Sequence, residues 1–277
     1  MKRIIPHILI YLLVVLGCCA APGFSASFKI ASYNVENLFD LHFDGTEYPD
    51  YVPGGPHGWD STQLDVKLGN IASVIKDLDA DIIALQEIES EKALTLLQRR
   101  LLLLGAKYPF SAIAEKRLTP VKCAVLSRFP ITAQKEILPG NHNERNILKL
   151  QIDIEGNPLI LYVNHWKSKA GPESKRLIYA RSLAADISTL ACDVDFILIG
   201  DFNSDYNEYE TFKLVSRLND TRGVTGINHI IHTVKGQEMV GESLLTQQKD
   251  CQYVYNLWLE IPEYRRWSVN FFGRKNS

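Results

Sequence analysis

The sequence has almost no excess charge of either sign. Its 277 residues carry 30 Lys and Arg against 32 Asp and Glu, a formal net charge of −2. A protein that coats nucleic acid through a broad basic surface is therefore excluded. Internal repeats and low-complexity tracts are also lacking. Hydrophobic residues make up 46% and charged residues 22% of the chain, which excludes a disordered protein and is typical of a globular one.

Cysteine is scarce, with five residues in all. Cys123, Cys192 and Cys251 show neither C-x-x-C spacing nor a His at zinc spacing, so the common structural zinc motifs are excluded. One disulfide with one thiol left over stays open as an alternative. We expect buried free cysteines instead, because Cys123 lies inside the apolar run 121–126.

The first 26 residues resemble a secretory signal peptide rather than part of the fold. Lys2 and Arg3 form a positive start, residues 8–16 are apolar, and small residues follow. The segment is short for a spanning helix, although an N-terminal membrane anchor stays an alternative. A second alternative is a lipoprotein, because residues 15–18 resemble a lipobox ending at Cys18. We therefore predict export to the periplasm or the medium, with no spanning segment after the signal peptide is removed.

The hydrophobic pattern of residues 27–277 alternates between helices and strands. Leu64, Leu68, Ile71 and Ile75 repeat at helix spacing, and Gly105 is placed to end the second helix. The expected helices are 61–78, 91–104 and 173–190, and the expected strands are 28–35, 82–85, 110–114, 121–127, 131–138, 148–154, 159–164, 196–200 and 253–259. Strands 110–164 follow one another through short turns, which predicts an antiparallel meander. Together the elements predict stacked sheets covered by helices.

Polar side chains with catalytic or metal-binding chemistry stand where apolar strands end. Asn34, Glu87, His165 and Asp201 each follow or close such a run, and Asn203 comes two residues after Asp201. Strand ends are where packed sheets present side chains to a crevice. Each residue alone is weak evidence, but the recurrence on four strands predicts a shared site.

Five segments around these residues resemble the endonuclease/exonuclease/phosphatase superfamily, and the form of the fourth is most similar to secreted bacterial members. In chain order the segments are Ser32–Asn37 (SYNVEN), Leu85–Glu87 (LQE), Val125–Ile131 (VLSRFPI), Asn164–Ser168 (NHWKS) and Gly200–Asn203 (GDFN). The resemblance implies an α/β fold, a four-layer sandwich of two mixed β-sheets flanked by helices. It also implies hydrolysis of phosphate esters with Mg²⁺, with Mn²⁺ or Ca²⁺ as alternatives.

The resemblance implies roles for eight residues. Glu87, supported by Asn34, would bind the metal. Asp201 would orient or deprotonate the attacking water, and Asn203 and His165 would donate hydrogen bonds to phosphoryl oxygens. The phosphate contacts would come from Arg145, Arg176 and Lys167, with Ser168 as a further candidate.

Two family motifs expected near the C-terminus are not found in this sequence. One begins a strand with Asp, and the other contains an Asp-His pair whose His is the usual general base. Asp-His occurs nowhere here, and Asn228-His229 carries Asn where the pattern needs Asp, so we interpret it as a coincidence in a substrate loop. The family domain, residues 27–277, is accordingly expected to be C-terminally incomplete and to expose a sheet edge.

Three functions follow as alternatives. The first is a metal-dependent phosphoesterase, foremost a nuclease that hydrolyses phosphodiester bonds, impaired by the missing motif. The second is an inactive remnant that binds metal or phosphate at most. The third is a phosphodiesterase acting on phospholipid or sphingomyelin. We expect a monomer without a stable protein partner, and a phosphodiester substrate, foremost a nucleic acid.

Overall fold

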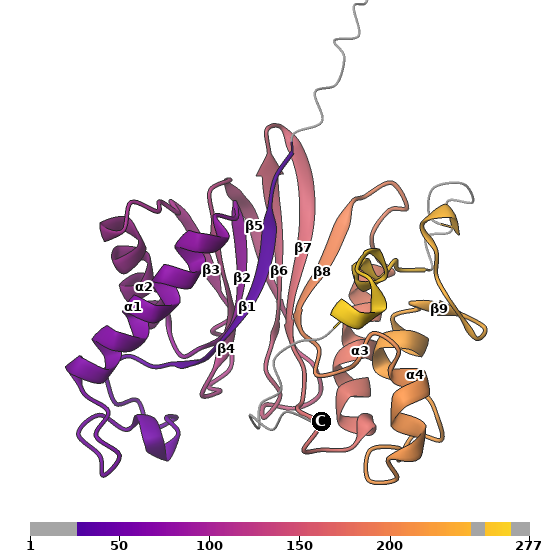
Figure 1. Cartoon of the computed structure of the whole chain (residues 1–277), viewed down its shortest axis with the longest axis horizontal. Helices are drawn as coiled ribbons and strands as arrows, with labels where there is room; N and C mark the ends of the chain where they lie inside the picture. The colour runs from indigo at the N-terminus through magenta and orange to yellow at the C-terminus, as the bar shows by residue number, and fades with distance from the viewer. Residues whose placement is uncertain (1–26, 245–252, 267–277) are drawn as a thin grey trace, which may run out of the picture.

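Two four-stranded β-sheets lie face to face, with helices on both outer sides (Figure 1). This computed structural model describes residues 27–244 and 253–266. The strands are β1 (Ile30–Leu38), β2 (Ile82–Ile88), β3 (Phe110–Ile113), β4 (Lys122–Ser127), β5 (Ile131–Ile137), β6 (Ile147–Ile154), β7 (Asn157–His165), β8 (Phe196–Asp201), β9 (Val234–Lys235) and β10 (Glu238–Met239). The helices are α1 (Ser61–Leu78), α2 (Glu91–Leu103), α3 (Glu173–Ile187) and the short α4 (Glu208–Thr211).

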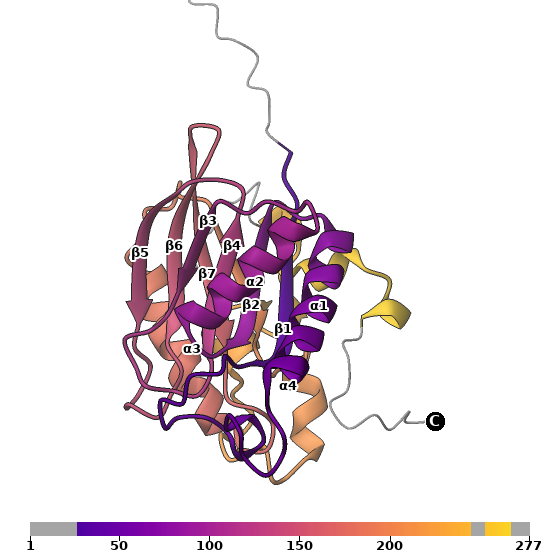
Figure 2. The same cartoon turned by 90° about the vertical axis from the view of Figure 1, so that its left-hand side faces the viewer.

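The first sheet has the strand order β1-β2-β4-β3. β1 and β2 are parallel and are joined through α1, whereas β2, β4 and β3 pair antiparallel. α1 has the predicted bounds: Asp60 caps its first turn, and its buried residues are Leu64, Leu68, Ile71, Ala72 and Ile75. Figure 2 shows α1 and α2 lying over the outer face of this sheet.

The second sheet has the strand order β5-β6-β7-β8. β5, β6 and β7 pair antiparallel, and β7 pairs parallel with β8 through the connection that contains α3. In the part of the chain that the structure describes, β8 is an edge strand, and all six of its residues are half-buried. The exposed sheet edge expected from a missing C-terminal segment stays a prediction.

Three apolar layers hold the sandwich together. Along β2, Ile83 and Leu85 face α1 and α2, while Ile82 and Ala84 face the second sheet. The third layer lies between the second sheet and α3 and includes Tyr162. Alternate residues of a strand point to opposite faces, and β2 is buried on both, which explains why its first four residues are all apolar. The predicted fold class, two mixed sheets flanked by helices, is confirmed.

Two secondary-structure expectations were wrong in part. The predicted meander is divided between the sheets: β3 and β4 belong to the first, and the chain crosses to β5 of the second at residues 128–130. The hydroxyl of Ser127 stabilises this turn by accepting from the Phe129 amide. The expected strand 253–259 is not formed. Asn256 instead caps a 3-10 turn at Leu257–Glu260.

The cysteines have different environments. Cys123 is buried and free, as expected. Cys192 is disulfide-bonded, which corrects the expectation that it is a free thiol, and its partner lies outside the described residues. The predicted signal peptide (1–26), Cys18 and Cys251 also lie outside them. Among the described helices, none combines the length and the apolar character that crossing a membrane requires.

Candidate active site

Four strand ends from the two sheets converge on one group of side chains. Asn34 lies on β1, Glu87 on β2, His165 ends β7 and Asp201 ends β8. In the second sheet His165 pairs directly with Asp201. The parallel strands of each pair end at the same edge, so their terminal side chains meet where the sheets lie side by side. The structure thus brings these four strand-end residues together, whereas their predicted roles in catalysis and metal binding stay predictions.

The amide of Asn34 links the two carboxylates. Its Nδ2 donates to Oε1 of Glu87 at 3.1 Å and to Oδ2 of Asp201 at 3.2 Å. The Asn34 Oδ1 in turn accepts from the main-chain amide of Glu36 at 3.0 Å, which fixes the orientation of the side chain. One neutral amide therefore holds carboxylates that are 167 − 53 = 114 residues apart in the chain.

Glu87 has an unusual backbone. Its φ is +69°, and the pairing register shifts on both sides of β2 at this point, which marks a bulge. A bulge re-aims a side chain and is common next to active sites. Burial raises the pKa of the Glu87 carboxyl, and the nearby charge of Asp201 acts in the same direction. The hydrogen bond from Asn34 and the charge of Arg145 oppose this shift only in part.

His165 is neutral at physiological pH in this environment. Its side chain is only 3% exposed, and burial, assisted by the positive charge of Arg145, lowers its pKa well below the ordinary value. Its Nε2 lies 3.6 Å from Oε1 of Glu87 and 3.9 Å from Oδ2 of Asp201. A neutral imidazole keeps one N–H, so His165 can act as a hydrogen-bond donor rather than as a cation.

The turn after β8 positions Asn203 beside Asp201. The Asn203 amide N–H donates to Oδ1 of Asp201 at 2.9 Å, and its Nδ2 donates to the main-chain oxygen of Trp166 at 3.1 Å. Asn203 has a φ of +48°, a conformation that Asn tolerates better than most residues. Trp166 is fully buried and donates from its indole to Asn164 at 3.0 Å, so the loops after β7 and β8 support each other.

The residues predicted to contact phosphate lie in different environments. Arg145 is half-buried beside the group, where it donates to the Trp166 oxygen at 3.2 Å. Its charge contributes to the lowered pKa of His165 and partly opposes the raised pKa of Glu87. Lys167 is exposed and Ser168 half-buried on the loop after β7. These positions agree with the predicted neighbourhood, but a phosphate contact by any of the three stays a prediction.

Arg176 lies in a different environment from the one expected. It is completely buried in α3, where its Nε donates to Glu173 at 2.7 Å. Its Nη1 reaches the main-chain oxygens of Lys167, Ser168 and Gly171. Through these contacts Arg176 stabilises the loop that follows β7. Its surroundings therefore do not favour the phosphate contact predicted from the sequence.

The segment around Asn228 and His229 forms a single π-helical turn, Gly226–Ile230, rather than a loop. Asn228 is fully buried, and its side chain bonds to Tyr206 and Thr233. The Nδ1 of His229 accepts from the Thr225 amide at 3.0 Å. The turn packs against α3, so this part of the earlier interpretation, a substrate loop, was wrong.

Two residues that support the site were given no role in the sequence analysis. Gly200 has a φ of +129°, and a Cβ there would lie 2.1 Å from the main-chain oxygen of Asn164, so only glycine fits directly before Asp201. Lys67 on α1 donates to the Glu36 oxygen at 2.8 Å. The Gly-Asp pair at a strand end offered a usable clue to Gly200, whereas Lys67 looks like any polar residue on the outer face of a helix.

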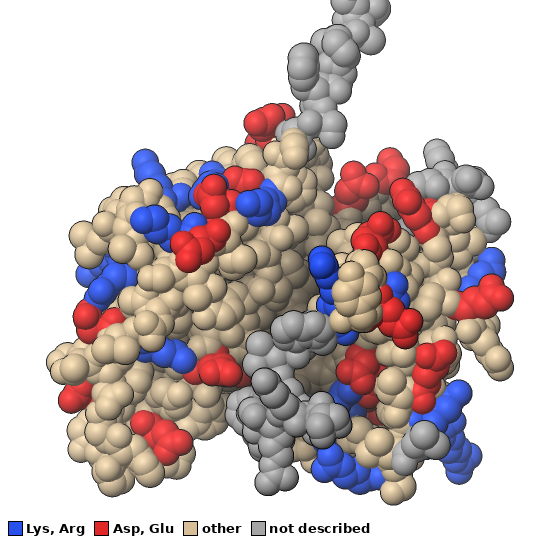
Figure 3. Space-filling view, in the orientation of Figure 1, with Lys and Arg blue, Asp and Glu red and all other residues tan. Residues whose placement is uncertain are grey.

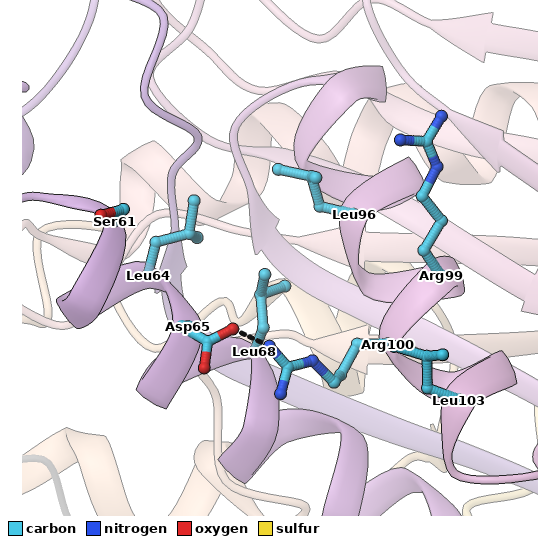
Figure 4. A pocket seen from close by; sticks show the side chains of 8 residues that line it. All are labelled: Ser61, Leu64, Asp65, Leu68, Leu96, Arg99, Arg100 and Leu103. Carbon is cyan, nitrogen blue, oxygen red and sulfur yellow. Dashed lines mark hydrogen bonds and ion pairs between the residues drawn. The ribbon is translucent and has the colours of Figure 1, made fainter.

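The side chains present fit a hard divalent cation. The side chains of Glu87 and Asp201 are 18% and 32% exposed, and the nearby charge of Asp201 helps to raise the pKa of the Glu87 carboxyl. A cation would oppose that rise, and carboxylate and amide oxygens are the ligands that Mg²⁺ prefers. The groove between α1 and α2, lined by Leu64, Asp65 and Arg100 among others, contains none of these residues and is a separate surface feature (Figure 4).

Comparison with known proteins gives the family. Residues 29–243 match the model of the Endonuclease/Exonuclease/phosphatase family, and the chain therefore belongs to that family. The match supports metal-dependent phosphodiesterase chemistry as the class of activity. A search of curated proteins found no match.

Several solved structures are similar to this chain at low sequence identity. Humanized D. rerio TDP2 is 18% identical, with a TM-score of 0.46 over 64% of this chain and 62% of that one. C. elegans TDP2 is also 18% identical, with a TM-score of 0.46 over 70% of this chain and 51% of that one. A β-hairpin deletion mutant of Staphylococcus aureus beta toxin is 15% identical, with a TM-score of 0.47 over 65% and 68%. The chain thus spans less than two thirds of the length of the first two.

Proposed function

We propose that this protein is an exported, metal-dependent phosphodiesterase that hydrolyses nucleic acid. The observation that carries the proposal is the convergence of Asn34, Glu87, His165 and Asp201 from four strand ends in two sheets. The family match to residues 29–243 supports the same class of chemistry.

Glu87 and Asn34 would hold Mg²⁺, with Asp201 close enough to share the ion. When bound, the ion would supply positive charge to a phosphoryl oxygen and to the leaving oxygen. Asp201 orients and deprotonates the attacking water. Its Oδ1 is held by the Asn203 amide, so the direction of the carboxylate is set before substrate binds.

Neutral donors and one cation then stabilise the charge that develops on the phosphate. His165 donates from a nearly dry position, where a hydrogen bond is stronger than in water. Asn203 adds a second donor, and Arg145 adds a positive charge from the loop before β6. Lys167 extends from the rim and would contact the neighbouring phosphate of a longer substrate.

Charge and disulfide chemistry agree with the remaining parts of the proposal. Figure 3 shows acidic and basic side chains interspersed over one face, with no broad basic field. Binding of the phosphate would accordingly be local, with a weak dependence on salt. Disulfides persist in oxidising compartments, so the disulfide of Cys192 supports export, with residues 1–26 as the signal peptide.

The test is cleavage of fluorescent single-stranded and duplex oligonucleotides by the full chain, with Mg²⁺ and after addition of EDTA. We expect cleavage that EDTA abolishes. Sphingomyelin vesicles and bis-p-nitrophenyl phosphate serve as parallel substrates. Turnover of sphingomyelin without turnover of oligonucleotides would replace the nuclease proposal by the lipid alternative. Mg²⁺ binding without turnover of any substrate would favour the inactive remnant.

Two matched Glu→Gln variants distinguish an effect at the candidate site from the general effect of removing one negative charge. Glu87→Gln keeps the shape of the side chain but removes its charge, and we expect at least a hundredfold loss of turnover. Glu155→Gln makes the same change at an exposed position in the β6–β7 turn and should leave turnover unchanged. Equal activity of the two variants would contradict the assignment of Glu87.

A further inference from the structure

A second group of carboxylates lies next to the candidate active site without sharing a residue with it. Asp44 and Glu47 belong to the loop between β1 and α1, and Glu89 follows the end of β2. One carboxylate oxygen from each residue lies within 4.8 Å of the corresponding oxygens of the other two. Asp44 is exposed, Glu47 half-buried and Glu89 buried, so the group extends from the surface into the protein.

Glu89 carries the observation that sets this group apart from an ordinary acidic cluster. Its side chain is only 1% exposed. Oε2 accepts from the Asp40 amide at 2.6 Å, but the buried Oε1 has no hydrogen-bond partner in the structure. A buried acceptor without a partner is costly, and a charged one more so. The Glu89 carboxylate is part of the group with Asp44 and Glu47, so a ligand bound among the three could satisfy this oxygen.

The nearest positive charge does not fill this role. Lys122 is buried close by, and its charge acts on both Asp44 and Glu89. Its ammonium, however, donates to the main-chain oxygen of Glu89 and leaves Oε1 unpartnered. One ammonium facing three carboxylates also leaves the group negative overall. A further cation would therefore offset the remaining negative charge and could give Oε1 a partner.

The loop holds its two carboxylates in fixed directions. Glu47 accepts from the amides of Asp44 and Gly45 at 2.6 and 2.9 Å, one on each oxygen. Asp44 accepts from the amide and the hydroxyl of Thr46 at 2.9 and 2.7 Å, both on Oδ1. Each carboxylate oxygen has two lone pairs, so both groups keep acceptor capacity for an ion.

We propose that Asp44, Glu47 and Glu89 form a Ca²⁺ site that fastens the β1–α1 loop to the end of β2. The donors are all oxygen, which selects a hard cation over zinc or copper. Two of them lie on a loop, and Ca²⁺ accepts irregular sets of six to eight oxygens completed by water, whereas Mg²⁺ demands a compact octahedron. Three carboxylates at a partly exposed site correspond to a Kd of about 10⁻⁴ M.

The test measures binding of Ca²⁺ alone to the full chain after EDTA treatment, by calorimetry. Glu47→Gln and Asp44→Asn lie at the surface and should fold, and each should weaken Ca²⁺ binding at least tenfold. Glu89→Gln should do the same if it folds. Asp50→Asn removes one charge from the same loop outside the group and should bind Ca²⁺ as the wild type does.

A second measurement is independent of phosphodiesterase activity. Ca²⁺ should slow proteolytic cleavage within residues 41–58 in the wild type and in Glu87→Gln, but not in Glu47→Gln. Wild-type binding by Glu47→Gln and Asp44→Asn would overturn the proposal. Loss of all Ca²⁺ binding in Glu87→Gln would overturn it too, because the ion would then belong to the candidate active site. Failure of the nuclease assay affects neither outcome.

Discussion

The candidate site is built from two β-strand–helix–β-strand units that hold their strand ends in different ways. The first unit is β1, α1 and β2, and the second is β7, α3 and β8. In the first, α1 packs through an apolar stripe, and β2 has a paired strand on each side. In the second, α3 buries the charged pair Glu173 and Arg176, and β8 is bonded in the described part of the chain only to β7.

This difference predicts which substitutions should destabilise the strand ends most. An apolar interface loses stability in proportion to the atoms removed, so single substitutions in the first unit have graded effects. A buried charge pair or a close backbone contact is lost when either partner is changed. A single substitution in the second unit should therefore cause a large loss of stability. The comparison makes three predictions, from the largest expected effect to the smallest.

Gly200→Ala should be the most damaging change in the second unit. The new Cβ would lie 2.1 Å from the oxygen and 2.8 Å from the nitrogen of Asn164, both main-chain atoms that cannot move without separating β7 and β8. We expect a loss of more than about 4 kcal/mol in the free energy of unfolding, measured by urea titration. Gly156→Ala, at φ +91° with open space around it, should lose only about 1–2 kcal/mol. Similar losses in the two variants would show that the contact at Gly200 is unimportant.

Asp186→Asn should lose about 3 kcal/mol at pH 7, because it removes the buried counter-charge of Lys149, whose side chain is only 15% exposed. Asp186 accepts from Lys135, Lys149 and the Tyr162 hydroxyl at 2.5, 2.6 and 2.8 Å. Burial alone would raise its pKa, but these hydrogen bonds outweigh burial and lower the pKa below the ordinary value. Urea titrations of the variant and the wild type check the size of the loss.

The pH dependence gives the sign of this contribution. Because the folded pKa is lowered, the carboxylate stabilises the protein above its unfolded pKa of about 4, and that stability is lost as the pH falls toward the folded pKa. The difference between the wild type and Asp186→Asn should therefore shrink below about pH 4. Asp193→Asn, an exposed control, should change stability by less than about 0.5 kcal/mol throughout. A pH-independent difference would speak against a charged Asp186.

Asp60→Ala should have the smallest effect, about 1 kcal/mol, in the first unit. Asp60 Oδ1 accepts from the amides of Thr62 and Gln63 at 2.8 and 3.0 Å and so caps α1, whereas α3 starts after Pro172 without a side-chain cap. Thermal unfolding followed by circular dichroism measures the change. Ser61→Ala is the neighbouring control, and an equal loss there would point to the helix start in general rather than to the cap.

The sequence was most informative where one local pattern decides the structure. The bounds of α1 follow from Asp60 as cap and from Leu64, Leu68 and Ile71 at helix spacing. The strand ends of the site were likewise visible, since Glu87 follows the apolar run 82–85 by two residues and Asp201 directly follows the run 196–200.

What the sequence could not show depends on contacts between distant segments. Alternation within β5 does not say which sheet it joins, so the division of the meander was hidden. Arg176 and Glu173 stand three residues apart, a spacing common on solvated helix faces, yet both are completely buried. The orphaned Oε1 of Glu89 is a property of three-dimensional packing alone.

The central claim is that the two units contribute to one site, and a double-mutant cycle tests it most directly. Glu87 represents the first unit and Asp201 the second, and Asn34 joins them. The measurement is kcat/KM for Mg²⁺-dependent oligonucleotide cleavage by the wild type, Glu87→Gln, Asp201→Asn and the double variant. Residues that act as one unit are strongly non-additive, so the double variant should be no slower than the worse single variant within about threefold. Multiplication of the two single losses would show that the carboxylates act independently and would contradict the account.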